Sequence, residues 1–247
     1  MDFRIKALQG YFGGKGASGV HQKIINLIPP HHTFVVPFLG HCAITRSLRP
    51  CNNWYLNDID PRVVASWQKF QRKNPEHFAT NTTVLNWSWH KMLPSAMDHP
   101  EVVMYLDPPY PEETLKGNHR FKFRMENDGH VELLEKIGKF NNANILLSTY
   151  DNALYEFYLK NWNKISFEAQ TQSGKSAIET LYFNFEPPTR LHDYRYFGDN
   201  HRSRERYKDK RKNLVDKFER MTALERNYFM DALTDPTTGK TTRLENH

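Results

Sequence analysis

Residues 102–110 read VVMYLDPPY, an apolar run that changes abruptly into an acid, two prolines and a tyrosine. A short, uninterrupted run of this kind is typical of a strand that is buried on both faces of a parallel sheet. The two prolines cannot continue the strand, because each lacks a backbone N–H and fixes φ. We therefore expect a stiff turn at the carboxyl end of a buried strand.

Further apolar runs predict strands around this one. They are residues 33–38, 54–56, 145–149 and 178–185. Apolar residues at helical spacing predict helices between them, at residues 20–28, 62–72, 130–140 and 152–160. Alternating strands and helices predict an α/β domain with a mostly parallel sheet. Ligands bind beyond the carboxyl ends of the strands in such a sheet, so residues 107–110 occupy the edge where chemistry is expected.

The composition is that of a globular protein, with 38% hydrophobic and 25% charged residues in a chain of 247. No apolar run approaches the roughly 18 residues that a membrane helix needs. Residues 1–10 lack the apolar stretch of a signal peptide, and two cysteines are too few for a disulfide framework or a four-thiolate zinc site. We expect a cytoplasmic protein without a metal or a membrane partner, with one domain over residues 1–233 and a flexible tail at 234–247.

Basic side chains are concentrated near the carboxyl end. Residues 202–220 hold nine lysines and arginines against four acids, which accounts for +5 of the net charge of +6. The pattern from residue 202 to about 233 is helical. Such a stretch favours a polyanionic partner, although a solvated helix with paired charges gives the same pattern. Arg204, Arg206 and Lys210 are the residues that we expect to bind nucleic acid.

The turn at residues 107–110 suits chemistry on an aromatic amine. The nitrogen of such an amine is a poor nucleophile, because its lone pair is delocalised into the ring. The Asp107 carboxylate and the Pro108 carbonyl could draw the nitrogen toward tetrahedral geometry, while the Tyr110 ring stacks on the base. A base in a duplex must leave its stack to reach such groups. A rigid turn without chemistry is the other interpretation.

This turn and several further motifs resemble the Dam-type DNA adenine-N6 methyltransferases, in a compact, phage-associated branch. The motifs that carry the resemblance are YFGGK at 11–15, VVPFLGHCAI at 35–44, LNDID at 56–60, DPPY at 107–110, STYD at 148–151 and the basic segment at 192–212. YFGGK resembles the family's N-terminal motif. VVPFLGHCAI resembles its cofactor loop, and LNDID resembles the strand end whose acid holds a ribose. DPPY is the family's catalytic motif.

The resemblance implies a Rossmann-like methyltransferase sheet with helices on both faces. It also implies S-adenosylmethionine as cofactor and methyl transfer to the N6 amine of adenine in double-stranded DNA, in a restriction-modification or phage setting. The implied catalytic residues are Asp107, Pro108, Pro109 and Tyr110. The implied cofactor-binding residues are Tyr11, Lys15, Phe38, Gly40, Asp58 and Asp107. Taken alone, Asp58 could instead cap the helix that follows Pro61.

The cofactor loop departs from the family pattern. Val36 stands where the family has an acid, and His41 and Cys42 follow Gly40 where the family is glycine-rich. These side chains would crowd the methionine end of the cofactor unless the loop shifts. Asn86 or Ser88 would replace an acid near the cofactor's adenine. Two alternatives therefore stay open: a catalytically impaired DNA-binding relative, and a methyltransferase acting on RNA.

Nucleic-acid contacts must come from short segments, because little sequence separates Asp60 from the DPPY turn. Residues 116–124, KGNHRFKFR, alternate cations with aromatic rings. In an extended chain Arg120, Lys122 and Arg124 would lie on one side to meet phosphates, with the two phenylalanines on the other. An edge strand with its rings in the core would show the same alternation.

Overall fold

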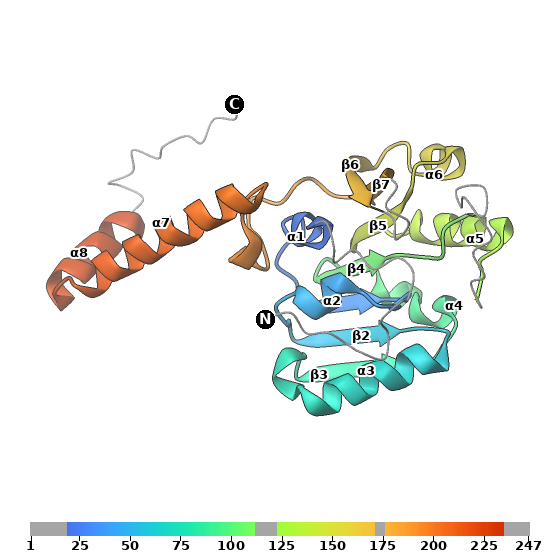
Figure 1. Cartoon of the computed structure of the whole chain (residues 1–247), viewed down its shortest axis with the longest axis horizontal. Helices are drawn as coiled ribbons and strands as arrows, with labels where there is room; N and C mark the ends of the chain where they lie inside the picture. Colours follow the sequence, from blue (N-terminus) through green and yellow to red (C-terminus); the bar gives the residue numbers. More distant parts are fainter. Residues whose placement is uncertain (1–18, 112–122, 171–175, 235–247) are drawn as a thin grey trace. The chain divides into compact units, whose positions relative to one another are not determined.

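The computed structural model describes residues 19–111, 123–170 and 176–234 (Figure 1). Within these residues, seven strands form one sheet in the order β3-β2-β1-β4-β5-β7-β6. The strands are β1 Thr33–Val36, β2 Asn53–Asn57, β3 Asn81–Leu85, β4 Val102–Leu106, β5 Asn144–Tyr150, β6 Asn163–Gln170 and β7 Ser176–Phe183. Strands β1 to β5 run parallel, and β7 pairs antiparallel with both β5 and β6. The mostly parallel, Rossmann-like sheet is confirmed.

Short helices connect the strands and cover both faces of the sheet. They are α1 Val20–Ile25, α2 Ala43–Ser47, α3 Pro61–Lys73, α4 Trp89–Met92, α5 Asn127–Ile137 and α6 Ala153–Tyr158. Helices α1, α2 and α3 share one apolar cluster with the sheet, and α4, α5 and α6 share another. Successive residues of β4 point to opposite faces of the sheet, so Tyr105 packs in the first cluster and Met104 in the second.

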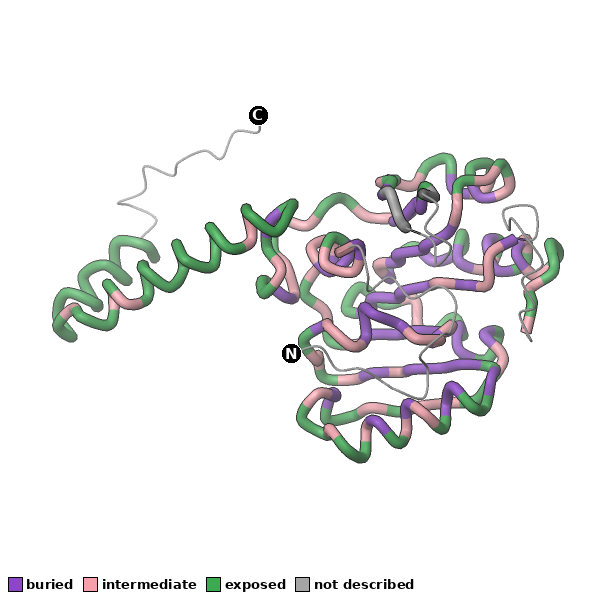
Figure 2. The backbone as a smooth tube through the Cα atoms, in the orientation of Figure 1, coloured by how far each residue is buried: buried purple, intermediate pink, exposed green. Residues whose placement is uncertain are grey.

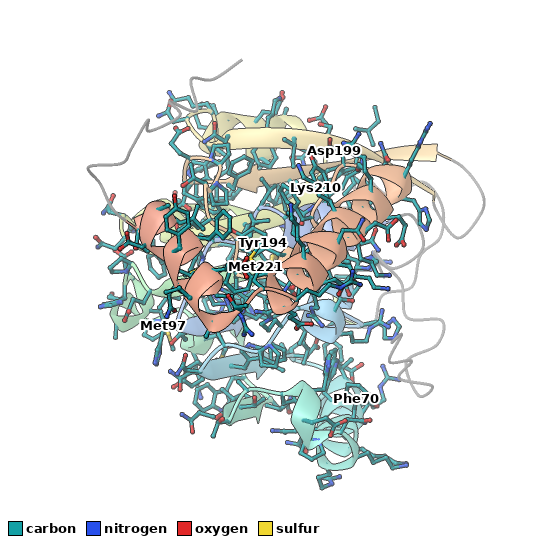
Figure 3. All side chains as sticks on the ribbon, turned by 90° about the vertical axis from the view of Figure 1, so that its left-hand side faces the viewer. Phe70, Met97, Tyr194, Asp199, Lys210 and Met221 are labelled. Carbon is teal, nitrogen blue, oxygen red and sulfur yellow. The ribbon has the colours of Figure 1, made fainter. Side chains whose placement is uncertain are left out.

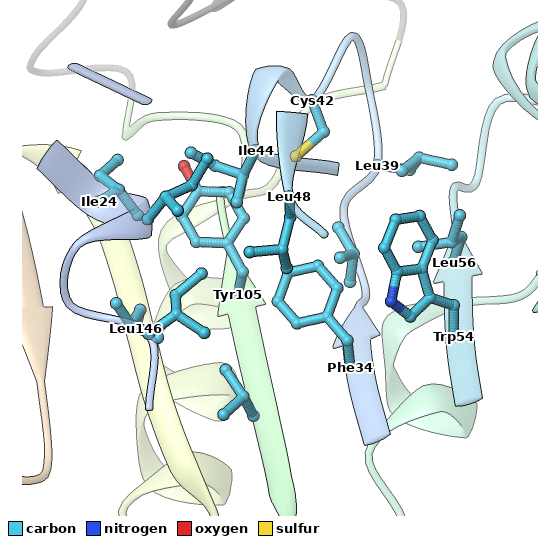
Figure 4. Close-up of a cluster of buried hydrophobic side chains, with 14 of the residues drawn as sticks. Ile24, Phe34, Leu39, Cys42, Ile44, Leu48, Trp54, Leu56, Tyr105 and Leu146 are labelled. Atoms are coloured by element: carbon cyan, nitrogen blue, oxygen red, sulfur yellow. The ribbon is translucent and has the colours of Figure 1, made fainter. Parts of the chain in front are cut away.

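The central strands β1, β4 and β5 are buried along most of their length (Figure 2). All five residues of β4 are buried, as expected for a strand flanked by β1 and β5 and covered on both faces. In Figure 4, Phe34 of β1 and Tyr105 of β4 point toward Leu48 and Ile44, which belong to the segment of α2. This packing fixes the carboxyl ends of the central strands, where the candidate site lies.

The strand order reverses between β1 and β4. From β1 the sheet continues through β2 to β3, and from β4 it continues through β5 in the other direction. In open α/β sheets this reversal is the point where ligands bind, beyond the carboxyl ends of the strands. The segments that leave β1 and β4 are Pro37–Cys42 and Asp107–Tyr110, so both predicted motifs flank the switch point.

The chain divides into two compact units, residues 1–196 and 197–247. The described part of the second unit contains α7 His201–Glu219 and α8 Ala223–Thr234. Asn200 and Ser203 form a capping box at the start of α7. Thr222 and Glu225 bond each other reciprocally before α8, which explains why the predicted helix over 202–233 is two helices. In Figure 3, Lys210 lies on α7 and Met221 on the turn between the helices. The extent of the domain, to residue 233, stays a prediction.

Candidate active site

The DPPY turn leaves the centre of the sheet. Leu106, the last residue of β4, is fully buried, and Asp107 follows it half-buried. Val35 of β1 pairs with Met104 of β4, so the chain leaves the two strands at the same level of the sheet. The turn and the loop after β1 are therefore neighbours. Burial raises the pKa of the Cys42 thiol in this loop, and the nearby negative charge of Asp107 raises it further.

Tyr110 lies between two carboxylates. Its hydroxyl donates to Glu179 Oε1 at 2.8 Å and lies 3.4 Å from Asp107 Oδ1. Its ring centroid is 4.4 Å from that of Tyr150, with the planes at 50°. Burial raises the pKa of Tyr110 well above its usual value, and the charges of Asp107 and Glu179 add to this effect. Tyr110 is therefore a neutral hydrogen-bond donor within a small aromatic and acidic cluster.

Glu179 is a site residue that the motifs did not identify. It is 4% exposed, belongs to β7 and pairs in register with Tyr150 of β5. Ser148 Oγ also donates to Glu179 Oε1, at 3.2 Å. A signal was present in the alternation of residues 178–185, where Glu179 shares a face with Leu181 and an exposed Ile178 lies on the other. An acid on the buried face of a strand requires a polar partner.

The loop after β1 is held by hydrogen bonds from three directions. Gly40 adopts φ +43°, a conformation that favours glycine. Its N–H donates to Asp58 Oδ2 at 2.7 Å, and its carbonyl accepts from Trp67 Nε1 at 2.8 Å. Cys42 is buried and its Sγ accepts from the Thr45 N–H at the start of α2, 3.4 Å away. The Cys42 side chain thus caps the amino end of α2.

Asp58 joins the ends of β1 and β2. Besides the Gly40 N–H, its carboxylate accepts the N–H of Asp60 at 2.8 Å. Burial raises the pKa of Asp58, and these two hydrogen bonds act in the opposite direction. The reading of Asp58 as the helix cap is wrong, because the side chain of Asp60 caps α3 through the Arg62 N–H. A hydrogen bond from the Ile59 backbone also lowers the pKa of Asp58, so backbone N–H groups of three residues share the carboxylate of a residue that is 7% exposed.

The neighbouring strand ends carry exposed apolar groups on a rigid backbone. Asn57 accepts from the Trp87 N–H at 2.8 Å and donates to the Trp87 carbonyl at 3.0 Å. Asn86 donates to the carbonyls of Asp58 and Ile59 at 2.8 and 3.0 Å. Ile59 and Trp87 are 52% and 45% exposed. These residues therefore offer apolar surface and a side-chain amide oxygen next to Asp58.

The other predicted site residues fall in several places. Phe38 is half-buried and packs on the cluster of α4, α5 and α6. Arg124 is exposed just before α5. Arg206 and Lys210 are exposed on α7, and Arg204 on the same helix is half-buried. Tyr11, Lys15, Arg120 and Lys122 lie outside the described residues.

The basic residues of α7 line a shallow surface. The residues that line it are Arg202, Glu205, Arg206, Asp209, Lys210, Asn213, Leu214 and Lys217. Their spacing of three and four places them on one face of the helix. Four of the eight are basic and two are acidic, so this face carries net positive charge.

In the described ranges, no three histidine, cysteine, aspartate or glutamate side chains gather as a metal site would need. No helix of the described part is both long and apolar enough to cross a membrane.

Comparison with known proteins gives structural neighbours only. No family model and no curated protein matches the chain. An rRNA methylase from Streptococcus thermophilus is 11% identical, with a TM-score of 0.44 over 67% of this chain and 94% of its own. A Pyrococcus horikoshii protein, provisionally an RNA methyltransferase, is 10% identical, with a TM-score of 0.46 over 73% and 96%. A tRNA (uracil-54, C5)-methyltransferase from Pyrococcus abyssi, in complex with S-adenosyl-L-homocysteine, is 10% identical, with a TM-score of 0.42 over 68% and 37%. The ligand and the substrates are properties of those proteins.

Proposed function

We propose that the protein is an S-adenosylmethionine-dependent methyltransferase that acts on the N6 amine of adenine in DNA. The observation that carries the proposal is the placement of Asp107–Tyr110 at the carboxyl end of β4, beside the Gly40 loop and across the switch point of the sheet. An amine-orienting acid and a cofactor loop belong on adjacent strand ends if a methyl group is to pass between their ligands.

The residues at the ends of β2 and β3 fit the cofactor. Asp58 lies just after the end of β2, the position from which the acid of dinucleotide-binding folds accepts hydrogen bonds from the ribose hydroxyls. Ile59 and Trp87 offer apolar surface for an adenine ring, and Asn86 offers an amide oxygen to its amine. Cys42 does not crowd the loop, since its side chain is buried against α2. Tyr11 and Lys15 stay predicted contacts of the cofactor.

The DPPY turn prepares the amine for attack. When bound, S-adenosylmethionine supplies a methyl group on a positively charged sulfur. Asp107 and the Pro108 carbonyl accept hydrogen bonds from the two N–H groups, and Tyr110 stacks on the base. The Asp107 carboxylate would stabilise the positive charge that the amine nitrogen gains as it takes the methyl group in place of the sulfur. The nitrogen then loses one proton to solvent, so no covalent enzyme intermediate is needed.

Nucleic-acid binding is assigned to cations of α7 and of the segment at 116–124. Arg204, Arg206 and Lys210 lie on α7, whose charge suits the phosphate backbone. Arg124 is the described cation of the alternating segment at 116–124, and Arg120 and Lys122 stay predictions outside the described residues.

One incubation separates the candidate activities. The full chain is mixed with methyl-labelled S-adenosylmethionine and either unmethylated duplex DNA or RNA, and the nucleic acid is digested to nucleosides. Label in N6-methyldeoxyadenosine supports the proposal. Label only in a ribonucleoside establishes the RNA alternative. Saturable cofactor binding by calorimetry without any label would indicate a different acceptor, and no binding would indicate a catalytically impaired relative.

A further inference from the structure

The Tyr110 hydroxyl has one proton and two carboxylates within reach. Glu179 Oε1 is 2.8 Å from the hydroxyl oxygen and Asp107 Oδ1 is 3.4 Å away. A phenol donates one hydrogen bond at a time, and the distance of about 2.7–2.8 Å that O–H···O bonds prefer is that to Glu179. In this structure the hydroxyl therefore donates to Glu179 and lies beside Asp107 without a short bond to it.

Glu179 is held where it can compete for this proton. It lies on β7 within a continuous ladder, opposite Tyr150 of β5 and Phe167 of β6. Ser148 of β5 donates to the same oxygen at 3.2 Å. Since Glu179 is 4% exposed and Ile178 beside it is 58% exposed, the strand turns its acid inward and its aliphatic side chain outward. The acid is thus placed by the sheet and not by a loop.

We propose that Glu179 is a positioning residue of the pocket that would hold the substrate amine. By accepting the hydrogen bond of the Tyr110 hydroxyl, Glu179 keeps that hydroxyl from donating to Asp107. The inference rests on the proposed function, in which Asp107 must accept from the substrate amine. A hydroxyl that donated to Asp107 would occupy an acceptor and weaken the pull on the amine nitrogen. The same bond fixes the Tyr110 ring against Tyr150, in the orientation that the base would meet.

The test is a double-mutant cycle between Glu179 and Tyr110. Glu179→Leu removes the acceptor, and Glu179→Gln keeps a neutral one in the same volume. We expect kcat for methyl transfer to fall by about tenfold in Glu179→Leu, which corresponds to about 1.4 kcal/mol, and by less in Glu179→Gln. The Kd for S-adenosylmethionine should stay within about twofold, because the described hydrogen bonds of Glu179 are to Tyr110 and Ser148, which are not among the residues assigned to the cofactor.

The decisive comparison is made in the Tyr110→Phe variant, because phenylalanine has no hydroxyl that could donate to Asp107. We expect Glu179→Leu to cost little when added to Tyr110→Phe. An equal loss of kcat in both backgrounds would overturn the inference and leave Glu179 a structural residue, as would full activity of Glu179→Leu alone. Ser166→Ala, which removes a hydroxyl bonded to Thr180 on the same ladder, controls for disturbance of β7.

A spectroscopic readout keeps the inference separate from the activity. The tyrosine rings are labelled with carbon-13, and the Tyr110 resonance is assigned by its loss in Tyr110→Phe. We expect Glu179→Leu to shift this resonance and Ser166→Ala to leave it in place. If the wild-type protein transfers no methyl group, the proposed function fails, and the shift still decides whether Glu179 holds the hydroxyl. An unchanged resonance in Glu179→Leu would overturn the inference.

Discussion

The Gly40 N–H donates a 2.7 Å hydrogen bond to the Asp58 carboxylate, which ties the loop after β1 to the end of β2. The other Asp58 oxygen accepts the Asp60 N–H, so one side chain sets two backbone segments at the candidate cofactor site. The acid thus has a structural role that is independent of any ligand. Because Asp58 is also assigned to the cofactor, its replacement should affect both folding and ligand binding, and the two effects can be measured separately.

Asp58→Asn should lower both stability and cofactor affinity. Asparagine keeps the size but presents an N–H₂ group to one of the two backbone donors, which then loses its partner. We expect the free energy of unfolding to fall by about 1–3 kcal/mol in urea titrations. Calorimetry should show S-adenosylmethionine binding weakened by about tenfold or more. Glu76→Gln, at an exposed acid, is the control, and a variant with unchanged stability would contradict the geometry described for Asp58.

Trp67→Phe should destabilise the same loop from the other side. The indole N–H donates to the Gly40 carbonyl at 2.8 Å and the ring is fully buried, so the variant loses a donor and leaves a small cavity. The expected loss is about 2–4 kcal/mol, measured by thermal and urea unfolding. Trp87→Phe changes an indole that is 45% exposed and should alter stability by less than about 0.5 kcal/mol. Equal losses in the two variants would speak against a special role for the Gly40 contact.

Stability should fall as the solution is acidified below about pH 6.5. Burial lowers the pKa of His31 to about 3 and that of His130 to about 4. The unfolded chain therefore binds protons at these histidines that the folded chain refuses, and unfolding takes up protons between pH 6.5 and about 3 to 4. Asp58, whose pKa is raised, acts in the opposite sense.

Urea titrations from pH 7.5 to 4.5 would measure this slope. We expect His31→Gln to flatten it, because glutamine does not titrate and can still donate to the Pro29 carbonyl that His31 approaches at 2.8 Å. A stability that rises toward acid, or a slope that His31→Gln leaves unchanged, would show that the two histidines are not buried in their neutral form.

Loss of cations on α7 should weaken DNA binding and its dependence on salt. Replacing Arg204, Arg206 and Lys210 by alanine removes up to three phosphate contacts, each worth about 0.9 in the slope of log K against log salt. Fluorescence anisotropy with a labelled duplex measures both quantities. Alanine at Lys69, Arg72 and Lys73 on α3 is the matched control for net charge. Equal losses in the two triple variants would mean that charge alone and not α7 attracts DNA.

The strongest sequence signals were the buried central strands. The run VVMYL predicted β4 with its observed bounds, because a strand buried on both faces is apolar throughout. Strands β3 and β6 were missed: both lie at edges of the sheet, and β3 carries only two apolar residues among its exposed and half-buried positions. Helices α2 and α4 span one turn each and are too short to show a period.

Some roles of the site residues could not be predicted from the sequence, because they depend on contacts between distant segments. The LNDID motif placed acids at the end of β2, but only hydrogen-bond geometry distinguishes Asp60, which caps α3, from Asp58, which does not. Glu179 reaches Tyr110 from 69 positions away, through the antiparallel pairing of β7 with β5. No local pattern contains that pairing, so the contact could be found only in the folded chain.

The most direct test of the account is methyl transfer by Asp107→Ala, beside the wild-type protein, with labelled S-adenosylmethionine and unmethylated duplex DNA. Without the carboxylate the amine is neither oriented nor stabilised as it becomes positive, so transfer to adenine N6 should fall by at least about 100-fold. DNA binding, measured on the same samples, should stay within about twofold, because Asp107 is not among the assigned phosphate contacts. Wild-type protein that labels adenine N6 and a silent Asp107→Ala variant are the predicted result; turnover retained in Asp107→Ala would contradict the role given to the DPPY turn.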